Sequence, residues 1–187
     1  MDIVFVMDAS GSIGEENFPS MTNFVANIVL GFSQNVHVGV VRYSSSASVI
    51  QRLTQVTNPG ILAQFVRSIA YTGGGTDTAA GIQVGQSLFQ TADRCSENVK
   101  VLYILTDGRS DNLQRTTQSA NAAKNDGIQI YTSGIGPSVN QEELTAVASS
   151  PSSDYMLPIA NFSNSAFNDR VSALQQGACT SKYIFVM

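Results

Sequence analysis

The feature that most restricts the fold is an apolar run, Ile3 to Met7, which leads directly into the polar loop Asp8-Ala9-Ser10-Gly11-Ser12. An apolar run of this length predicts a strand that is buried on both faces of a sheet. Strands of this kind are typical of parallel sheets, in which ligands bind beside the carboxyl ends of the strands. We therefore expect the loop at Asp8 to lie at the functional edge of a sheet.

Strand and helix patterns alternate along most of the chain. Apolar runs predict further strands at about 36–43, 47–53, 99–105, 128–135 and 155–157. Helical spacing of apolar residues predicts helices at about 15–34, 59–69, 78–89, 111–126, 141–149 and 163–176. This order predicts an α/β fold: a doubly wound, Rossmann-like three-layer sandwich, with helices on both faces of a mostly parallel six-stranded sheet. The turn Ser44-Ser45-Ser46 joins its two flanking strands as a hairpin, which supplies one antiparallel edge strand.

Length and charge narrow the function classes. A chain of 187 residues fits a single domain, residues 1–187. Its 10 Lys and Arg residues are scattered among 14 Asp and Glu, which disfavours a nucleic-acid surface. No apolar run approaches the roughly 20 residues of a membrane span, and the first residues lack the pattern of a secretory signal. Because Met1 leads straight into strand residues, we interpret the chain as an excised domain whose missing signal says little about compartment.

Two cysteines and one glycosylation sequon bear on the compartment. Cys95 precedes a predicted strand and Cys179 ends the last predicted helix, so both are expected at the end of the sheet opposite the Asp8 loop. Two cysteines are compatible with one disulfide or with two buried thiols. Their shared location favours the disulfide and an oxidising, extracellular compartment, in a secreted protein or in the ectodomain of a surface protein. The sequon at Asn161 adds limited support.

Three loops are expected to meet at one edge of the sheet, since loops that follow parallel strands share one side. They carry two carboxylates and three hydroxyls: Asp8, Asp107, Ser10, Ser12 and Thr76. Asp8 and Asp107 close together would repel, which raises the pKa of one of them unless a cation lies between them. The hydroxyls can bind such a cation without adding charge. Hard oxygen donors of low total charge suit Mg²⁺ or Mn²⁺, which keep several waters and accept an outside ligand.

The same loops resemble those of the von Willebrand factor type A family. The resemblance rests on Asp8-x-Ser10-x-Ser12, Gly75-Thr76-Asp77-Thr78 and Leu105-Thr106-Asp107-Gly108, and it extends from Asp2-Ile3-Val4-Phe5 through Gly134-Ile135-Gly136 to the closing helix. In that family the motif is the metal-ion-dependent adhesion site. The resemblance implies Mg²⁺ held by Ser10, Ser12 and Thr76, with Asp8 and Asp107 binding directly or through water. Thr78 is not carried over, because the family's ligand is the first Thr of that turn.

The resemblance also implies a function. It indicates a non-enzymatic adhesion or matrix-assembly module, in which an acidic side chain of an extracellular-matrix or cell-surface protein completes the metal's ligand set. It further implies that the closing helix, at about 163–176, shifts as the metal changes between Asp107 and Thr76 coordination. A disulfide between Cys95 and Cys179 would restrain that helix.

One departure from the family narrows the partner. Collagen-binding integrin domains carry an extra short helix after the strand that corresponds to residues 128–135. Here Gly136-Pro137-Ser138-Val139-Asn140 leads straight to the next predicted helix. An integrin-type collagen pocket is therefore not expected, while collagen binding by another surface stays open.

Other interpretations stay open for the function and for three polar residues. A structural spacer with an unused metal site is one alternative. A Mg²⁺-dependent phosphohydrolase of the haloacid dehalogenase type is another, although its second Asp is replaced here by Ser10 and its Lys is not found. Asp77 and Asp111 are interpreted as helix-start carboxylates, or alternatively as groups that tune the metal site from outside its ligand set. We interpret His37 as a surface or edge residue.

Overall fold

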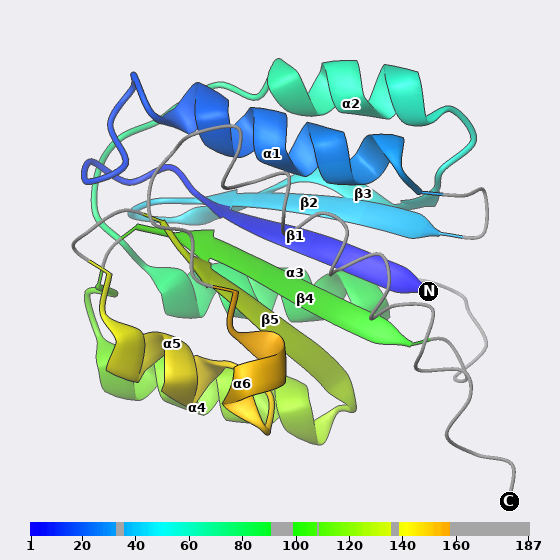
Figure 1. Cartoon of the computed structure of the whole chain (residues 1–187). Coiled ribbons are helices and arrows are strands. Elements are labelled where there is room, and N and C mark those ends of the chain that lie inside the picture. The colour runs from blue at the N-terminus through cyan, green and yellow to red at the C-terminus, as the bar shows by residue number, and fades with distance from the viewer. Residues whose placement is uncertain (33–35, 91–98, 108, 136–138, 158–187) are drawn as a thin grey trace, which may run out of the picture.

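A computed structural model of the chain describes residues 1–32, 36–90, 99–107, 109–135 and 139–157. Its centre is a single sheet with the strand order β3-β2-β1-β4-β5 (Figure 1). The strands are β1 (Asp2–Asp8), β2 (His37–Tyr43), β3 (Ala47–Gln55), β4 (Lys100–Thr106) and β5 (Ile128–Gly134). All neighbours pair in parallel except β2 and β3, which form the predicted antiparallel hairpin.

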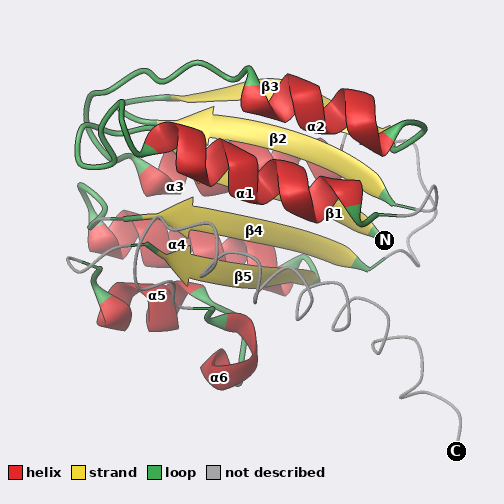
Figure 2. Cartoon of the chain, turned by 45° about the horizontal axis from the view of Figure 1, so that its top comes forward, coloured by secondary structure: helices red, strands yellow, loops and turns green. Residues whose placement is uncertain are grey.

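Helices cover both faces of the sheet. They are α1 (Phe18–Leu30), α2 (Pro59–Arg67), α3 (Thr78–Gln90), α4 (Leu113–Asn125), α5 (Gln141–Val147) and the short α6 (Ser152–Tyr155). Figures 1 and 2 show α1 and α2 on one face and α3 and α4 on the other, with α5 and α6 beside β5. Among the described residues, no helix is both long enough and apolar enough to cross a membrane.

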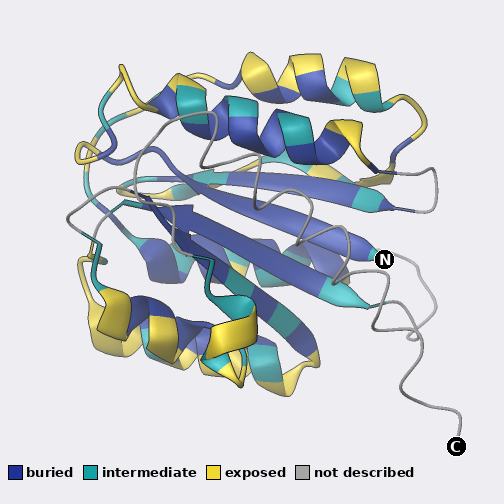
Figure 3. Ribbon diagram, in the orientation of Figure 1, coloured by how far each residue is buried: buried dark blue, intermediate teal, exposed yellow. Residues whose placement is uncertain are grey.

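The central strand β1 is buried along its whole length, as its apolar run predicts (Figure 3). Because side chains alternate along a strand, Ile3 and Phe5 pack in the core beneath α1 and α2, while Val4 and Val6 pack in the core on the α3 side. This double burial fixes β1 between two hydrophobic layers. Its carboxyl end, at Asp8, therefore emerges at a defined place on the edge of the sheet.

The helix α3 packs closely against the sheet because glycines face the strands. A Cβ atom added at Gly81 would lie 2.9 Å from side-chain atoms of Tyr43 and Val6, and one at Gly85 would lie 2.6 Å from Leu102. Contacts this short require the absence of a side chain. The close packing fixes the start of α3, which follows directly on the loop that carries Thr76.

Two predicted elements differ from the structure. The described part of the sheet has five strands rather than six, because Met156 makes only an isolated bridge to Thr132 and the residues before it form α6. The predicted helix at 15–34 begins only at Phe18, because Gly14, with φ of +75°, turns the chain just before it. The carbonyl oxygen of Gly14 accepts the N–H of Phe18 at 3.2 Å. Pro19 in the first turn then favours helix initiation there.

Several predictions fall outside the described residues. They concern Cys95, Cys179, the sequon at Asn161 and the closing helix at 163–176. The chain is described again from Val139, where Asn140 caps α5. The disulfide, the glycosylation and the helix shift therefore stay predictions.

Candidate metal site

The loop after β1 is folded around the buried carboxylate of Asp8. One oxygen of this carboxylate accepts the backbone N–H of Ser10 at 2.8 Å, and the other accepts the hydroxyl of Thr106 at 2.7 Å. A carboxylate that accepts the amide two residues ahead stabilises a tight turn. The turn brings the hydroxyl oxygens of Ser10 and Ser12 within 3.1 Å of each other. Three of the predicted donor residues thus cluster at the end of β1.

Asp107 joins this cluster from the neighbouring strand. The hydroxyl of Ser12 donates a hydrogen bond to Asp107 Oδ1 at 2.9 Å, across 95 positions of sequence. The parallel register of β1 and β4, which pairs Met7 with Leu105, brings the two loops together. Asp8, Ser10, Ser12 and Asp107 therefore form one continuous chain of hydrogen bonds.

Thr76 is placed beside the cluster by backbone contacts. It lies in the segment between α2 and α3, where Gly74 C=O accepts the N–H of Gly11 at 2.8 Å. On the same segment, the Tyr71 hydroxyl donates to the carbonyl of Ser10 at 3.1 Å. Thr76 is 8% exposed, and its hydroxyl makes no hydrogen bond within the described part of the chain. Its side chain is therefore available to a ligand, although no direct hydrogen bond links it to the other four donors.

The conformation of the loop that carries Thr76 requires a glycine at Gly74. Its φ of +99° is in the left-handed region, and an added Cβ would lie 2.7 Å from the hydroxyl oxygen of Ser45. Ser45 instead accepts the N–H of Gly75 at 2.7 Å. The hairpin turn between β2 and β3 thus supports the Thr76 loop from the outside.

The carboxylates at the site are unfavourably placed for two negative charges. Burial raises the pKa of Asp8 to about 6, although hydrogen bonds from Ser10 and Thr106 lower it, and the charge of Asp107 raises it further. Burial is also the main cause of a raised pKa at Asp107. A divalent cation would relieve both effects. The donor chemistry thus fits Mg²⁺ or Mn²⁺, which prefer carboxylate, hydroxyl and water oxygens.

Hydroxyl donors are required for a metal here. Across the described ranges, no group of three or more His, Cys, Asp or Glu side chains could hold an ion. The two carboxylates, Asp8 and Asp107, would therefore need the oxygens of Ser10, Ser12 and Thr76 as partners. Thr78 is not part of this set, since it lies buried at the start of α3, with its hydroxyl 3.4 Å from that of Tyr43.

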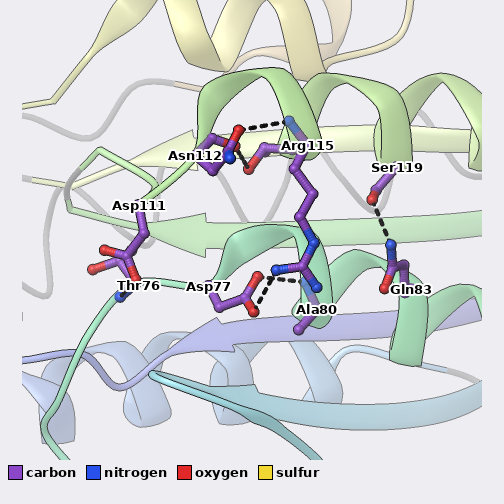
Figure 4. Close-up of polar contacts among 9 residues, drawn as sticks. Thr76, Asp77, Ala80, Gln83, Asp111, Asn112, Arg115 and Ser119 are labelled. Carbon is purple, nitrogen blue, oxygen red and sulfur yellow. Dashed lines mark hydrogen bonds and ion pairs between the residues drawn. The ribbon is translucent and has the colours of Figure 1, made fainter.

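Asp77 and Asp111 have different roles from each other (Figure 4). Asp77 behaves as the predicted helix-start carboxylate: it accepts the N–H of Ala80 at 3.0 Å and pairs with Arg115 at 2.8 Å. Asp111 does not cap a helix, because Asn112 caps α4 by accepting the N–H of Arg115 at 3.0 Å. Asp111 instead accepts the N–H of Thr76 at 2.9 Å. No local sequence signal predicts that contact.

The single histidine lies at the opposite end of the sheet. His37 begins β2, and its Nδ1 lies 3.1 Å from a carboxylate oxygen of Asp2 at the start of β1. Its side chain is 15% exposed and sits on an inner strand, so it is more buried than the predicted surface or edge residue. This position separates it from the oxygen cluster by the length of β1.

Fold and site together define a class of protein: an open α/β domain with an acidic, hydroxyl-rich oxygen cluster where its central strands end. Comparison with known sequences agrees, since the sequence model of the von Willebrand factor type A domain matches residues 2–175. The chain therefore belongs to the von Willebrand factor type A domain family.

Curated relatives of the chain are matrix proteins. It is 33% identical over 165 residues to human collagen alpha-1(XXI) chain, covering 86% of this chain and 17% of that protein. It is 32% identical over 167 residues to mouse vitrin, covering 87% of this chain and 25% of that protein. The chain thus spans a quarter or less of these relatives. Collagens and vitrin are extracellular-matrix proteins, and the location of this domain is extracellular, as the sequence predicts.

Solved structures share the fold. Proximal thread matrix protein 1 from the mussel byssus superposes with a TM-score of 0.83 at 23% identity, over 95% of this chain and 46% of that one. Another structure of that protein has zinc in its metal-ion-dependent adhesion site (MIDAS) motif. It gives a TM-score of 0.80 at 24% identity, over 93% of this chain and 45% of that one. The pilus adhesin SpaC from Lactobacillus rhamnosus GG gives 0.78 at 18% identity, over 95% and 30%. These similarities support the α/β fold.

Proposed function

We propose that residues 1–187 form one non-enzymatic adhesion or matrix-assembly domain, which binds a protein ligand through a divalent cation, Mg²⁺ or Mn²⁺. The proposed metal ligands are Asp8, Ser10, Ser12, Thr76 and Asp107. The observation that carries the proposal is the 2.9 Å contact between Ser12 and Asp107, which joins oxygen donors from two neighbouring strand ends. The matrix relatives support the extracellular setting.

The residues of the site suit a cation that stays receptive to a partner. Ser10, Ser12 and Thr76 contribute neutral oxygens, so that only Asp8 and Asp107 would offset the metal charge. When bound, a divalent cation would offer an open coordination position to an acidic side chain of the partner. The partner is then an acidic segment of a matrix or cell-surface protein. Collagen is included in that class, by a surface other than the integrin-type extra helix.

The surroundings of Asp8 favour binding over catalysis. A phosphohydrolase of the haloacid dehalogenase type uses the first Asp as a nucleophile. Here Asp8 is fully buried, and both of its oxygens accept hydrogen bonds. Ser10 also occupies the position of the second Asp in such enzymes. This arrangement supports a ligand role for Asp8.

The test is Asp107→Ala, compared with the wild-type chain in binding to immobilised extracellular-matrix extract. We expect Asp107→Ala to reduce Mg²⁺-dependent binding by at least about tenfold, since loss of a charged ligand to a buried cation costs several kcal/mol. Chelation by EDTA should reduce wild-type binding equally. Asp154→Ala removes an exposed carboxylate on α6 and is the matched control, expected to bind normally.

Three outcomes would contradict the proposal. Wild-type matrix binding that is unchanged in EDTA would exclude a metal-bridged ligand. Metal binding without any metal-dependent matrix binding would favour the structural spacer. Turnover of a generic phosphate ester in Mg²⁺ would restore the enzyme alternative.

A further inference from the structure

Thr76 is held by one residue from a distant loop. Its N–H donates to Asp111 Oδ2 at 2.9 Å, and its C=O accepts the N–H of Asp111 at 3.0 Å. Asp111 lies 35 positions away, just before α4, and Figure 4 shows it beside Thr76 at the edge of the sheet. Both backbone polar groups of Thr76 are thus bonded to Asp111, and its C=O also accepts the N–H of Thr78 at 3.0 Å. The N–H of Thr76 therefore depends on the Asp111 side chain, whereas its C=O is bonded to two backbone N–H groups.

The usual reasons for an aspartate at this place do not apply to Asp111. It does not cap α4, because Asn112 does so. The nearby guanidinium of Arg115 pairs with Asp77. Asp111 is an exposed residue. Among the described residues, the hydrogen-bond donor to its carboxylate is the N–H of Thr76. Positioning Thr76 is therefore the role that its contacts define.

The loop that contains Asp111 is itself anchored. The N–H of Ser110 lies 3.2 and 3.3 Å from the two carboxylate oxygens of Glu143, a buried residue of α5. The same connection begins at Asp107, which accepts the hydroxyl of Ser12. One loop between β4 and α4 thus carries a proposed metal ligand and also fixes the position of another, Thr76.

We infer that Asp111 is a positioning residue for the metal site: through two hydrogen bonds it keeps Thr76 in place to serve as a ligand. The inference rests on the proposed function. A partner that orients a metal ligand without touching the metal typically changes metal affinity 10- to 100-fold when it is removed. Asp111 acts by hydrogen bonding, and its charge is not required.

The structure offers an independent way to disturb this contact. A Cβ added at Gly75 would lie 2.8 Å from Asp111 Oδ2 and 3.3 Å from the hydroxyl of Ser45. Gly75 is not among the glycines with a positive φ, so alanine can adopt its backbone conformation. Gly75→Ala should therefore displace the carboxylate of Asp111 while Asp111 itself is unchanged.

The experiment measures the affinity of Mn²⁺ by isothermal titration calorimetry, using the whole chain and four variants. We expect Asp111→Ala and Gly75→Ala to weaken Mn²⁺ binding by about tenfold or more. Asp111→Asn should weaken it by less than about threefold, because an amide oxygen still accepts the N–H of Thr76. Asp126→Ala is the control: it removes an exposed aspartate at the other end of α4, which accepts one hydrogen bond from Gln86.

A second measurement tests, in the absence of metal, whether Asp111 holds Thr76 in place. The Thr76 amide of the metal-free protein, followed by hydrogen exchange in NMR spectra, should exchange about tenfold faster in Asp111→Ala than in wild type or Asp111→Asn. An equal loss of Mn²⁺ affinity in Asp111→Asn and Asp111→Ala would assign the effect to charge and overturn the inference. Unchanged Thr76 exchange in Asp111→Ala would also overturn it. A wild-type chain that binds no Mn²⁺ would remove the proposed function, while Thr76 exchange would still test the contact.

Discussion

At the scale of single residues, Asp8 combines deep burial with a charge. Its carboxylate is fully buried at the end of β1, where hydrogen bonds from Ser10 and Thr106 partly offset the cost of ionisation. A cation bound at the site would favour the charged form, whereas the metal-free protein has to bear that cost. The pKa of Asp8, raised to about 6, is the consequence.

The raised pKa predicts how pH affects the metal-free protein. The unfolded chain loses the Asp8 proton near pH 4, whereas the folded protein keeps it to about pH 6. Between these values the folded state binds more protons, so the contribution of Asp8 to stability is fully present below pH 4 and is lost as pH rises through 6. Relative to Asp8→Asn, the free energy of unfolding of the wild type should fall by about 1 kcal/mol from pH 5 to pH 7.

Urea unfolding of both proteins, after removal of metal, measures this difference. The comparison with Asp8→Asn removes the pH-dependent contributions that the two proteins share. A wild-type-minus-variant difference that is constant between pH 5 and pH 7 would contradict the raised pKa of Asp8.

The two adjacent residues before α4 give a second prediction at this scale. Asn112→Ala should lower the free energy of unfolding by about 1 kcal/mol, since it removes a helix cap. Asp111→Ala should lower it by about 0.5–1.5 kcal/mol, since it removes the acceptor of one hydrogen bond, from the N–H of Thr76. Thermal unfolding in EDTA measures both variants, and a loss well above about 1.5 kcal/mol for Asp111→Ala would mean that Asp111 stabilises the fold beyond this one contact.

At the scale of elements, α3 shows packing overriding helix propensity. Glycine inside a helix costs about 0.5–1 kcal/mol relative to alanine, so Gly85→Ala would stabilise an exposed helix. Here the added Cβ would lie 2.6 Å from Leu102 and 3.1 Å from Val6 in the core. Overpacking of this kind costs about 1–3 kcal/mol, which exceeds the gain.

We therefore expect Gly85→Ala to destabilise the protein by about 1–2 kcal/mol in urea unfolding. The control is Gln90→Ala, a change at an exposed position of the same helix, which should stay within about 0.5 kcal/mol of wild type. A stabilised Gly85→Ala would show that β1 and β4 yield more readily than close packing implies.

At the scale of the whole molecule, the proposed site joins loops from three parts of the chain. A ligand that binds only the folded state adds about 2.7 kcal/mol at 100 times its dissociation constant. For a chain of 187 residues, each kcal/mol raises the melting temperature by about 2–4 °C. Saturating Mn²⁺ should therefore raise the melting temperature of the wild type by about 5–10 °C.

Saturating Mn²⁺ should leave the melting temperature of Asp107→Ala within about 1–2 °C of its metal-free value. Differential scanning fluorimetry measures both proteins, with Ca²⁺ as a comparison ion. Equal stabilisation of wild type and Asp107→Ala would mean that Mn²⁺ binds elsewhere on the molecule.

The sequence by itself determined the local features of this protein. The apolar run at 3–7 specified a doubly buried strand, and the Ser44–Ser46 turn specified the hairpin. Two of the three motifs follow strands as predicted, those of Asp8 and Asp107, whereas the loop of Thr76 lies between α2 and α3. These features depend on residues that are close in sequence, so that periodicity and turn chemistry suffice. The metal itself stays a prediction from those donors.

Only the tertiary structure decided which distant groups meet. The first helix is shorter than predicted, and Met156 makes a single bridge in place of a sixth strand. The Asp111 carboxylate accepts the N–H of Thr76 and does not cap α4. Each outcome depends on how separate segments pack against the sheet, and a hydrogen bond across 35 positions has no local signature. Neighbouring residues set conformation, whereas the burial of two hydrophobic layers sets which loops come into contact.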